Sequence, residues 1–136
     1  MQADKSNSRQ HILIVDDDES VRYMLETKFM NAGYSVTAAV NGTHAIQILQ
    51  SGKKFALMIC DLKMQNKSGI EVIQFLKSTD LKMPIMILTA FPDRDKVMAA
   101  ASLGVRDVIV KPVRHHELLT MVKSKLEGSD SEKAAA

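Results

Sequence analysis

Four apolar runs of the sequence each end in a polar residue, and this pattern constrains the fold more than any other feature. The run from Ala56 to Cys60 ends at Asp61, with no turn residue before the carboxylate. Three further runs end in the same way: Ile12–Val15 at Asp16-Asp17-Asp18, Pro84–Leu88 at Thr89, and Val108–Val110 at Lys111. Continuous apolar runs of this length are typical of strands buried on both faces of a parallel sheet.

Helical patterns separate the apolar runs. Apolar residues at helical spacing predict helices over Glu19–Ala32, Thr43–Gln50 and Gly69–Ser78, from the Asp93 cap to Leu103, and through Leu118 to Leu126. Tyr34–Val40 alternates weakly and is predicted to be an edge strand. Five alternations of strand and helix predict a doubly wound, five-stranded parallel sheet with helices on both faces. The flavodoxin-like order 2-1-3-4-5 fits best, because it places the weakest strand at an edge.

Parallel strands bring their carboxyl ends to one edge of the sheet. The side chains of Asp16, Asp17, Asp61, Thr89 and Lys111 are therefore expected to meet there. In open α/β sheets ligands bind at this edge, at the point where the strand order reverses, which here lies between the first and third strands.

Length and composition indicate one ordinary soluble domain. The chain has 136 residues, of which 46% are hydrophobic and 25% charged, and a formal net charge of +2. We expect a disordered tail over residues 1–10, a folded domain over 11–127, and a disordered tail or the start of a linker over 128–136. There is no basic block for nucleic acid and no apolar run near the about 18 residues of a membrane span. The lone cysteine, Cys60, lies inside an apolar run, which favours a reducing compartment and a cytoplasmic protein.

The three consecutive aspartates allow two interpretations. Aspartate is favoured as an N-cap and beside the positive end of a helix dipole, so Asp16, Asp17 and Asp18 could serve only the helix that follows. Capping needs one side chain, however, and the remaining carboxylates would repel each other. A bound cation would relieve this repulsion, and a few hard oxygen ligands with room for water and phosphate suit Mg²⁺.

Asp61 could likewise cap the turn that follows it, or it could act as a nucleophile. A carboxylate can attack a phosphoryl group and hold it as an acyl phosphate. Phosphoryl transfer depends mainly on positioning and on neutralising charge. Mg²⁺ on Asp17 and Asp61, the ammonium of Lys111 and the hydroxyl of Thr89 would together meet both needs.

The ordered motifs Ile14-Val15-Asp16-Asp17, Asp61, Thr89-Ala90 and Lys111-Pro112 resemble the receiver domain of two-component response regulators, over about residues 10–126. The resemblance implies that Asp61 accepts a phosphoryl group from a sensor histidine kinase or a phosphotransfer protein. It implies that Mg²⁺ is held by Asp16, Asp17, Asp61 and the backbone carbonyl of Lys63, that Thr89 and Lys111 hold the phosphoryl group, and that Lys111-Pro112 is cis. Phosphorylation would change the surface of the fourth helix, fifth strand and fifth helix to control a downstream domain or protein, and a phosphorylation-dependent dimer is compatible with this.

Three positions depart from the receiver pattern. Val108 stands where receivers usually carry an aromatic residue whose rotation accompanies movement of the Thr, so the switch is expected to work differently here. Gln65 replaces a usual proline, and Phe91 is bulky where many receivers are polar. Lys63 and Phe91 occupy the positions that flank the path of an attacking water in receivers. We therefore expect self-phosphorylation and slow autodephosphorylation, but no turnover of an external substrate.

Two alternatives remain at this point. A phosphatase similar to the haloacid dehalogenase superfamily has an Asp-x-Asp nucleophile motif after its first strand, which Asp16-Asp17-Asp18 satisfies. Such enzymes place their acidic metal motif last along the chain, and no acidic pair ends the fifth strand here. The other alternative is an interaction module that keeps the fold without being phosphorylated. A small phosphodonor distinguishes the three, because a receiver gains an adduct, a phosphatase turns over and an inert module does neither.

Overall fold

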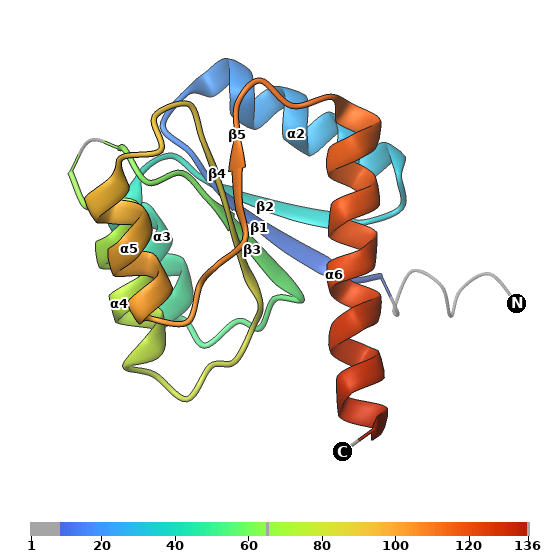
Figure 1. Cartoon of the computed structure of the whole chain (residues 1–136). Helices are drawn as coiled ribbons and strands as arrows, with labels where there is room; N and C mark the ends of the chain where they lie inside the picture. Colours follow the sequence, from blue (N-terminus) through green and yellow to red (C-terminus); the bar gives the residue numbers. More distant parts are fainter. Residues whose placement is uncertain (1–8, 65, 136) are drawn as a thin grey trace, which may run out of the picture.

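Strands and helices alternate along the whole described chain. The computed structural model describes the backbone of residues 9–64 and 66–135, and the side chains of these residues as far as Glu127. The elements in chain order are β1 (His11–Val15), α2 (Glu19–Asn31), β2 (Ser35–Ala39), α3 (Gly42–Gln50), β3 (Leu57–Cys60), α4 (Gly69–Lys77), β4 (Ile85–Thr89), α5 (Arg94–Ser102), β5 (Val108–Val110) and α6 (His115–Ala135) (Figure 1).

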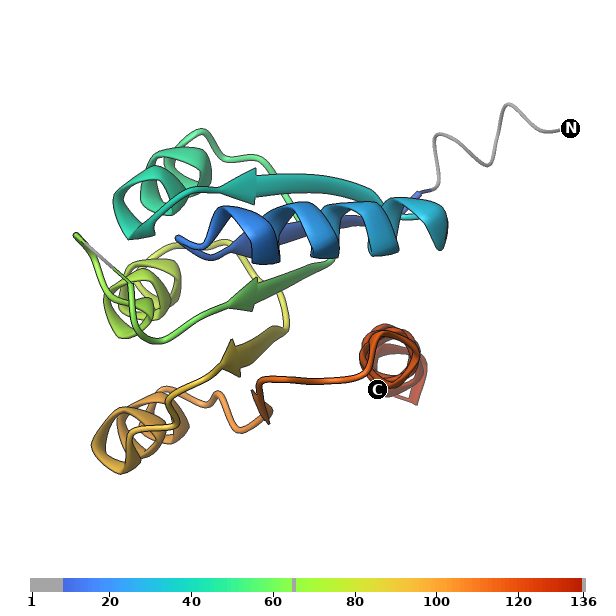
Figure 2. The ribbon, with the colours of Figure 1, turned by 90° about the horizontal axis from the view of Figure 1, so that it is seen from above.

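The five strands form one parallel sheet in the order β2-β1-β3-β4-β5, which confirms the predicted topology. The register places Val15 beside Cys60 and Thr89 beside Val110. β1, β3, β4 and β5 therefore end close to one another, and the polar residue that ends or follows each strand lies at the same edge of the sheet. Seen from above in Figure 2, the strands fan with the usual twist between the helical layers.

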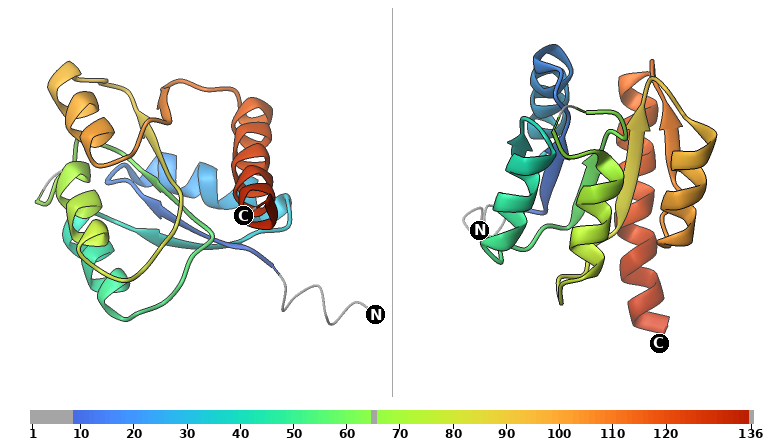
Figure 3. Two further views of the ribbon diagram at one scale, coloured as in Figure 1. Left: turned by 60° about the horizontal axis from the view of Figure 1, so that its bottom comes forward. Right: turned by 90° about the vertical axis from the view of Figure 1, so that its left-hand side faces the viewer.

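Alternate residues of the buried strands face two separate apolar cores. Leu13, Val15, Met58 and Ile87 pack with α3, α4 and α5, whereas their neighbours Ile12, Ile14, Leu57 and Leu88 pack with α2 and α6. Figures 1 and 3 show these two helical layers on opposite sides of the sheet. Burial on both faces explains why the strands read as unbroken apolar runs in the sequence.

Capping side chains and glycines mark the helix ends, and the predicted Asp93 cap is confirmed. The side chains of Asn41 and Asp93 accept amide hydrogen bonds at the starts of α3 and α5. Ser68 and Glu71 form a reciprocal capping box at the start of α4. Gly33, Gly52 and Gly104, which follow the ends of α2, α3 and α5, all have positive φ angles, the conformation in which glycine terminates helices.

The last helix runs past the predicted end of the folded domain. The sequence predicts a disordered tail or the start of a linker over residues 128–136; the backbone of α6 continues to Ala135, and the domain boundary at residue 127 stays a prediction. Beyond Gly128 the chain contains Glu, Lys and Ala, which are good helix formers, and one glycine costs a helix only about 1 kcal/mol. None of the described helices, α6 included, is both long and apolar enough to span a bilayer. Residues 1–8 of the expected N-terminal tail and residue 136 lie outside the described residues.

Candidate functional site

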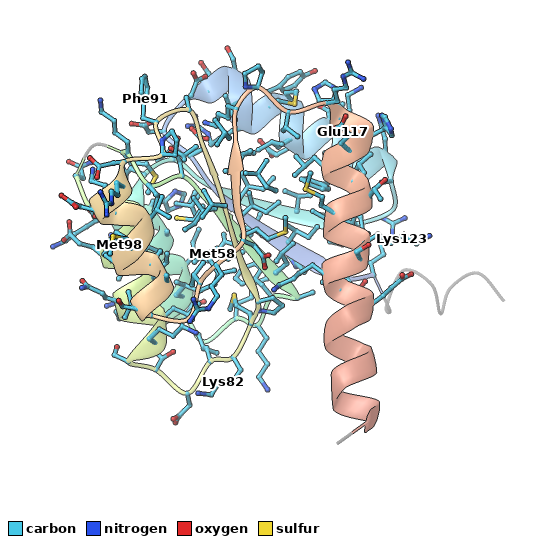
Figure 4. The ribbon with its side chains drawn as sticks, in the orientation of Figure 1. Met58, Lys82, Phe91, Met98, Glu117 and Lys123 are labelled. Carbon is cyan, nitrogen blue, oxygen red and sulfur yellow. The ribbon has the colours of Figure 1, made fainter. Side chains whose placement is uncertain are left out.

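A cleft of about 390 Å³ opens at the carboxyl edge of the sheet. Most of the residues that the sequence placed at this edge line it, and the full lining is Asp16, Asp17, Asp18, Asp61, Lys63, Met64, Ala90, Phe91 and Lys111. Figure 4 shows the labelled side chain of Phe91 at this end of the molecule and that of Lys82 at the opposite end. The predicted convergence of the strand-end residues is therefore confirmed for the carboxylates and the lysine.

Asp61 is held at the floor of the cleft by backbone contacts. Its amide donates to the carbonyl of Val15 at 3.0 Å, which extends the pairing of β3 with β1 by one residue. Its carboxylate accepts a hydrogen bond from the Lys63 amide at 3.1 Å through Oδ1. Only 8% of the residue is exposed, so the side chain has little freedom apart from its open edge toward the cleft.

Asp18 and Asp16, two of the three aspartates after β1, make different contacts. Asp18 is the N-cap of α2 and accepts from the Val21 amide, so the capping interpretation holds for one carboxylate of the three. Asp16 is 3% exposed and its Oδ1 accepts from the Asp18 amide at 2.9 Å. Arg22 of α2 donates from Nη1 to the backbone carbonyl of Asp16 at 2.9 Å. No sequence pattern predicts this contact, because it joins a side chain to a backbone atom six residues away.

Lys111 connects the two buried carboxylates. Its Nζ lies 2.8 Å from Asp16 Oδ2 and 3.1 Å from Asp61 Oδ2. Burial lowers the pKa of Lys111, but the hydrogen bond and charge of Asp16 and the charge of Asp61 outweigh burial, and its pKa is raised. Burial raises the pKa of Asp16, and the opposing hydrogen bond and charge of Lys111 do not fully compensate. The site thus holds one ammonium between two carboxylates, which leaves an uncompensated negative charge.

Asp16→Asn is expected to stabilise the protein at neutral pH. Because the folded-state pKa of Asp16 lies above its ordinary value of 3.8, the protonated carboxyl favours folding, and this contribution is lost as pH rises through the raised pKa. The neutral amide avoids that loss, and the gain in the free energy of unfolding at pH 7 should be about 1 kcal/mol, within the range of common single stabilising substitutions. Thermal unfolding at several pH values measures it. The advantage of the variant should shrink below the raised pKa of Asp16 and vanish below 3.8, whereas a lower melting temperature at pH 7 would contradict this view of Asp16.

Thr89 lies beneath the cleft rather than on its wall. Its side chain is fully buried at the end of β4, and its hydroxyl oxygen accepts a hydrogen bond from the Phe91 amide at 3.3 Å. The neighbouring residues Ala90 and Phe91 line the cleft in its place. Contact of this hydroxyl with a bound group would require a different side-chain orientation, so the role expected for Thr89 stays a prediction.

Lys63 and Phe91 contact each other across the mouth of the cleft. The Nζ of Lys63 lies 4.7 Å from the centre of the Phe91 ring, the geometry of a cation–π pair. Phe91 is 62% exposed although it is a large apolar residue. The two positions were expected to flank the site, but the contact between them was not predicted.

Comparisons with known proteins identify the fold and the family. The sequence profile of the response regulator receiver domain matches residues 12–123. The chain belongs to this family. The response regulator MprA of Mycobacterium bovis is 36% identical over 124 residues, which make up 91% of this chain and 54% of that protein. A CheY-like receiver domain from Methanospirillum hungatei superposes with a TM-score of 0.85 at 25% identity and covers 92% of this chain and 99% of that one.

A third relative concerns the metal. The response regulator TrrA of Thermotoga maritima, solved in complex with Mg²⁺ and BeF, has a TM-score of 0.74 and 29% identity, over 85% of this chain and 97% of that one. The chain spans about half the length of the first curated relatives it matches. These relatives include transcriptional regulators, which places this receiver domain among signalling modules of two-component type.

The side chains of the receiver domain fit a magnesium ion only with help from other ligands. Over the described part of the chain, no three carboxylate, imidazole or thiolate side chains are grouped closely enough to hold a metal by themselves. Mg²⁺ is commonly bound by one or two carboxylates together with waters and phosphate oxygens. Asp16, Asp17 and Asp61 line the same cleft, so the donor chemistry suits this mode of binding.

The remaining receiver features lie on β5 and just beyond it. The Lys111-Pro112 peptide bond is cis, as the resemblance implied. Val108, in place of the usual aromatic residue, is half-buried, pairs with Ile87 of β4 and packs against the core beneath α3, α4 and α5. With Arg106, Thr120 and Met121 it lines a groove between β5 and α6. A valine at this position has no ring that could move between an inner and an outer orientation.

Proposed function

We propose that this receiver domain is a phosphorylation-dependent switch whose phosphoacceptor is Asp61. The observation that carries the proposal is the convergence on one open cleft of the strand-end carboxylate of Asp61, three further acidic residues and a lysine that bridges Asp61 to Asp16. Its phosphodonor would be a sensor histidine kinase or a phosphotransfer protein in the cytoplasm, a compartment that suits the free, buried thiol of Cys60. Its output would be a further domain or a separate protein.

The chemistry required of the chain is modest. The carboxylate of Asp61 attacks phosphorus, the phosphoryl group passes to it as an acyl phosphate, and the donor oxygen or nitrogen leaves with the former bond pair. Asp16, Asp17, Asp61 and the Lys63 carbonyl would hold Mg²⁺, which neutralises phosphoryl charge when it is bound. Lys111 already lies beside Asp61, so its ammonium can donate to a phosphoryl oxygen after a small movement.

A small phosphodonor tests the proposal directly. With Mg²⁺ and acetyl phosphate, the protein should gain one phosphoryl group that persists long enough to be seen by intact mass or by a phosphate-affinity gel. Continuous release of phosphate from a model phosphomonoester, without an adduct, would instead assign a phosphatase. Neither adduct nor turnover would assign an interaction module.

The lifetime of the phosphoryl group should depend on Lys63 and Phe91. We expect slow autodephosphorylation, because their contact crowds the approach of water opposite the carboxylate oxygen and places a positive charge near the phosphoryl oxygens. The Lys63→Asn, Phe91→Ser double variant should lose phosphate at least severalfold faster, which requires only ~1 kcal/mol of barrier.

The decay of the adduct after removal of phosphodonor measures this lifetime. Lys67→Asn is a matched control, because Lys67 is an exposed lysine of the same segment that pairs with Glu71 instead of reaching Phe91. Lys63→Met separates charge from bulk by keeping the length of the side chain. Equal lifetimes in the parent and the double variant would contradict the proposal.

The output surface is proposed to be α5, β5 and α6. Because Val108 offers no ring, switching should depend on Thr89 and on the segment from Phe91 to Arg94 that leads into α5. Addition of a phosphoryl mimic should therefore shift the amide signals of this segment and of α5 in nuclear magnetic resonance spectra. Shifts confined to the residues just after Asp61, with α5 unchanged, would oppose this mode of switching.

A further inference from the structure

Two glycines near the site lie so close to neighbouring backbone atoms that a side chain at either position would clash with them. A methyl group on Gly69, the first residue of α4, would fall on the carbonyl oxygen of Asp61 and within 2.8 Å of the Leu62 Cα. The Gly69 amide also donates to the Leu62 carbonyl at 3.0 Å. The start of α4 is thus packed directly against the backbone of the phosphoacceptor.

The second glycine supports the same segment from α3. A methyl group on Gly42, the first residue of α3, would overlap the carbonyl oxygen of Lys67 and lie 2.6 Å from the carbonyl carbon of that residue. α3 is fixed at this end by its Asn41 cap, which accepts from the His44 amide at 2.8 Å. Lys67, which leads into α4, is therefore packed against the capped start of α3.

Backbone angles do not explain these two glycines. Gly33, Gly52 and Gly104 have positive φ angles, and a methyl group on them would meet either open space or only the end of the Lys77 side chain, so they serve the chain by their conformation. Gly42 and Gly69 are buried and are not among the residues with positive φ. The close approach of backbone atoms is the remaining reason for glycine at both positions.

We propose that Gly69, supported by Gly42, is a positioning residue for phosphoryl transfer, an inference that rests on Asp61 being the phosphoacceptor. A side chain at residue 69 must push the Asp61 carbonyl away from α4. The same backbone carries the carboxylate that contacts Lys111 and the Lys63 amide, so the carboxylate must move with it. Small displacements of a reacting atom cost much rate, whereas the fold can absorb them elsewhere.

Gly69→Ala should slow phosphorylation from acetyl phosphate by about tenfold or more. A 1 Å misplacement of a reacting group can cost ~10²-fold in rate, so a loss of this size needs only a small displacement. Gly42→Ala should slow it by a smaller factor, because its methyl group meets Lys67 rather than Asp61. Gly104→Ala is the matched control: its positive φ makes alanine strained there, but its nearest neighbour is the end of the Lys77 side chain at 3.9 Å, away from the site.

Three measurements distinguish positioning from a general loss of stability. Urea unfolding gives the stability of each variant, phosphorylation gives its rate constant, and the Asp61 and Leu62 amide signals report the local backbone. The inference is supported if Gly69→Ala is phosphorylated more slowly and has shifted Asp61 and Leu62 amide signals. An equally destabilised Gly104→Ala should show neither change. Equal rates in these two variants overturn it, and if Gly69→Ala does not fold, an unchanged rate in folded Gly42→Ala overturns it as well. Failure of the parent protein to be phosphorylated would instead reject the role of Asp61.

Discussion

Lys111→Met is expected to destabilise the protein by about 3 kcal/mol, because removal of one partner leaves buried charges without compensation. Asp16 and Asp61 are both buried and both contact the same Nζ, so methionine would leave two neighbouring carboxylates facing each other. Phosphorylation should also be severely slowed, because the Lys111 ammonium that contacts the Asp61 carboxylate would be lost. Urea unfolding at pH 7 measures the first effect, and reaction with acetyl phosphate the second.

The chain offers a matched control for this charge removal. Lys125 pairs with Asp107 at 2.5 Å, but both side chains are more than a third exposed. Exposed pairs contribute about 0–1 kcal/mol, so Lys125→Met should change stability little. Adding Asp16→Asn to Lys111→Met should restore part of the lost stability, because one of the two unpaired carboxylates becomes neutral. Similar losses in Lys111→Met and Lys125→Met would mean that the bridging lysine is no more stabilising than a surface pair.

The fold could be predicted from the sequence because burial on both faces leaves a simple pattern. Unbroken apolar runs such as Ile12–Val15 and Ala56–Cys60 indicated parallel strands, and a weak Tyr34–Val40 indicated the edge. Alternation with helices predicted a doubly wound parallel sheet, and the edge position of the weakest strand selected the order 2-1-3-4-5. The end of α6 could not be predicted in the same way, because Gly128 reads as a stop although a single glycine is tolerated in a helix.

Residues of the site could be placed from the sequence where the end of a strand fixes their position. Contacts that depend on side-chain rotation or on tertiary packing could be predicted less well. The position of Asp61 follows from the topology alone. The buried hydroxyl of Thr89, the contact of Lys63 with Phe91 and the hydrogen bond from Arg22 to the Asp16 carbonyl each depend on a rotamer, which no local pattern encodes. The tight approaches at Gly42 and Gly69 depend on how two helix starts meet the segment after β3, which no local sequence pattern encodes.

Phosphorylation of Asp61→Asn tests the central claim most directly. Asparagine keeps the shape of the side chain and can still accept from the Lys63 amide, but the amide is not a nucleophile that can hold a phosphoryl group. Asp80→Asn is the matched control, because Asp80 is an exposed carboxylate in the connection between α4 and β4. Each folded protein is treated with Mg²⁺ and acetyl phosphate, and the adduct is counted by intact mass. We expect one phosphoryl group on the parent and on Asp80→Asn and none on Asp61→Asn; an undiminished adduct on Asp61→Asn would place the acceptor elsewhere.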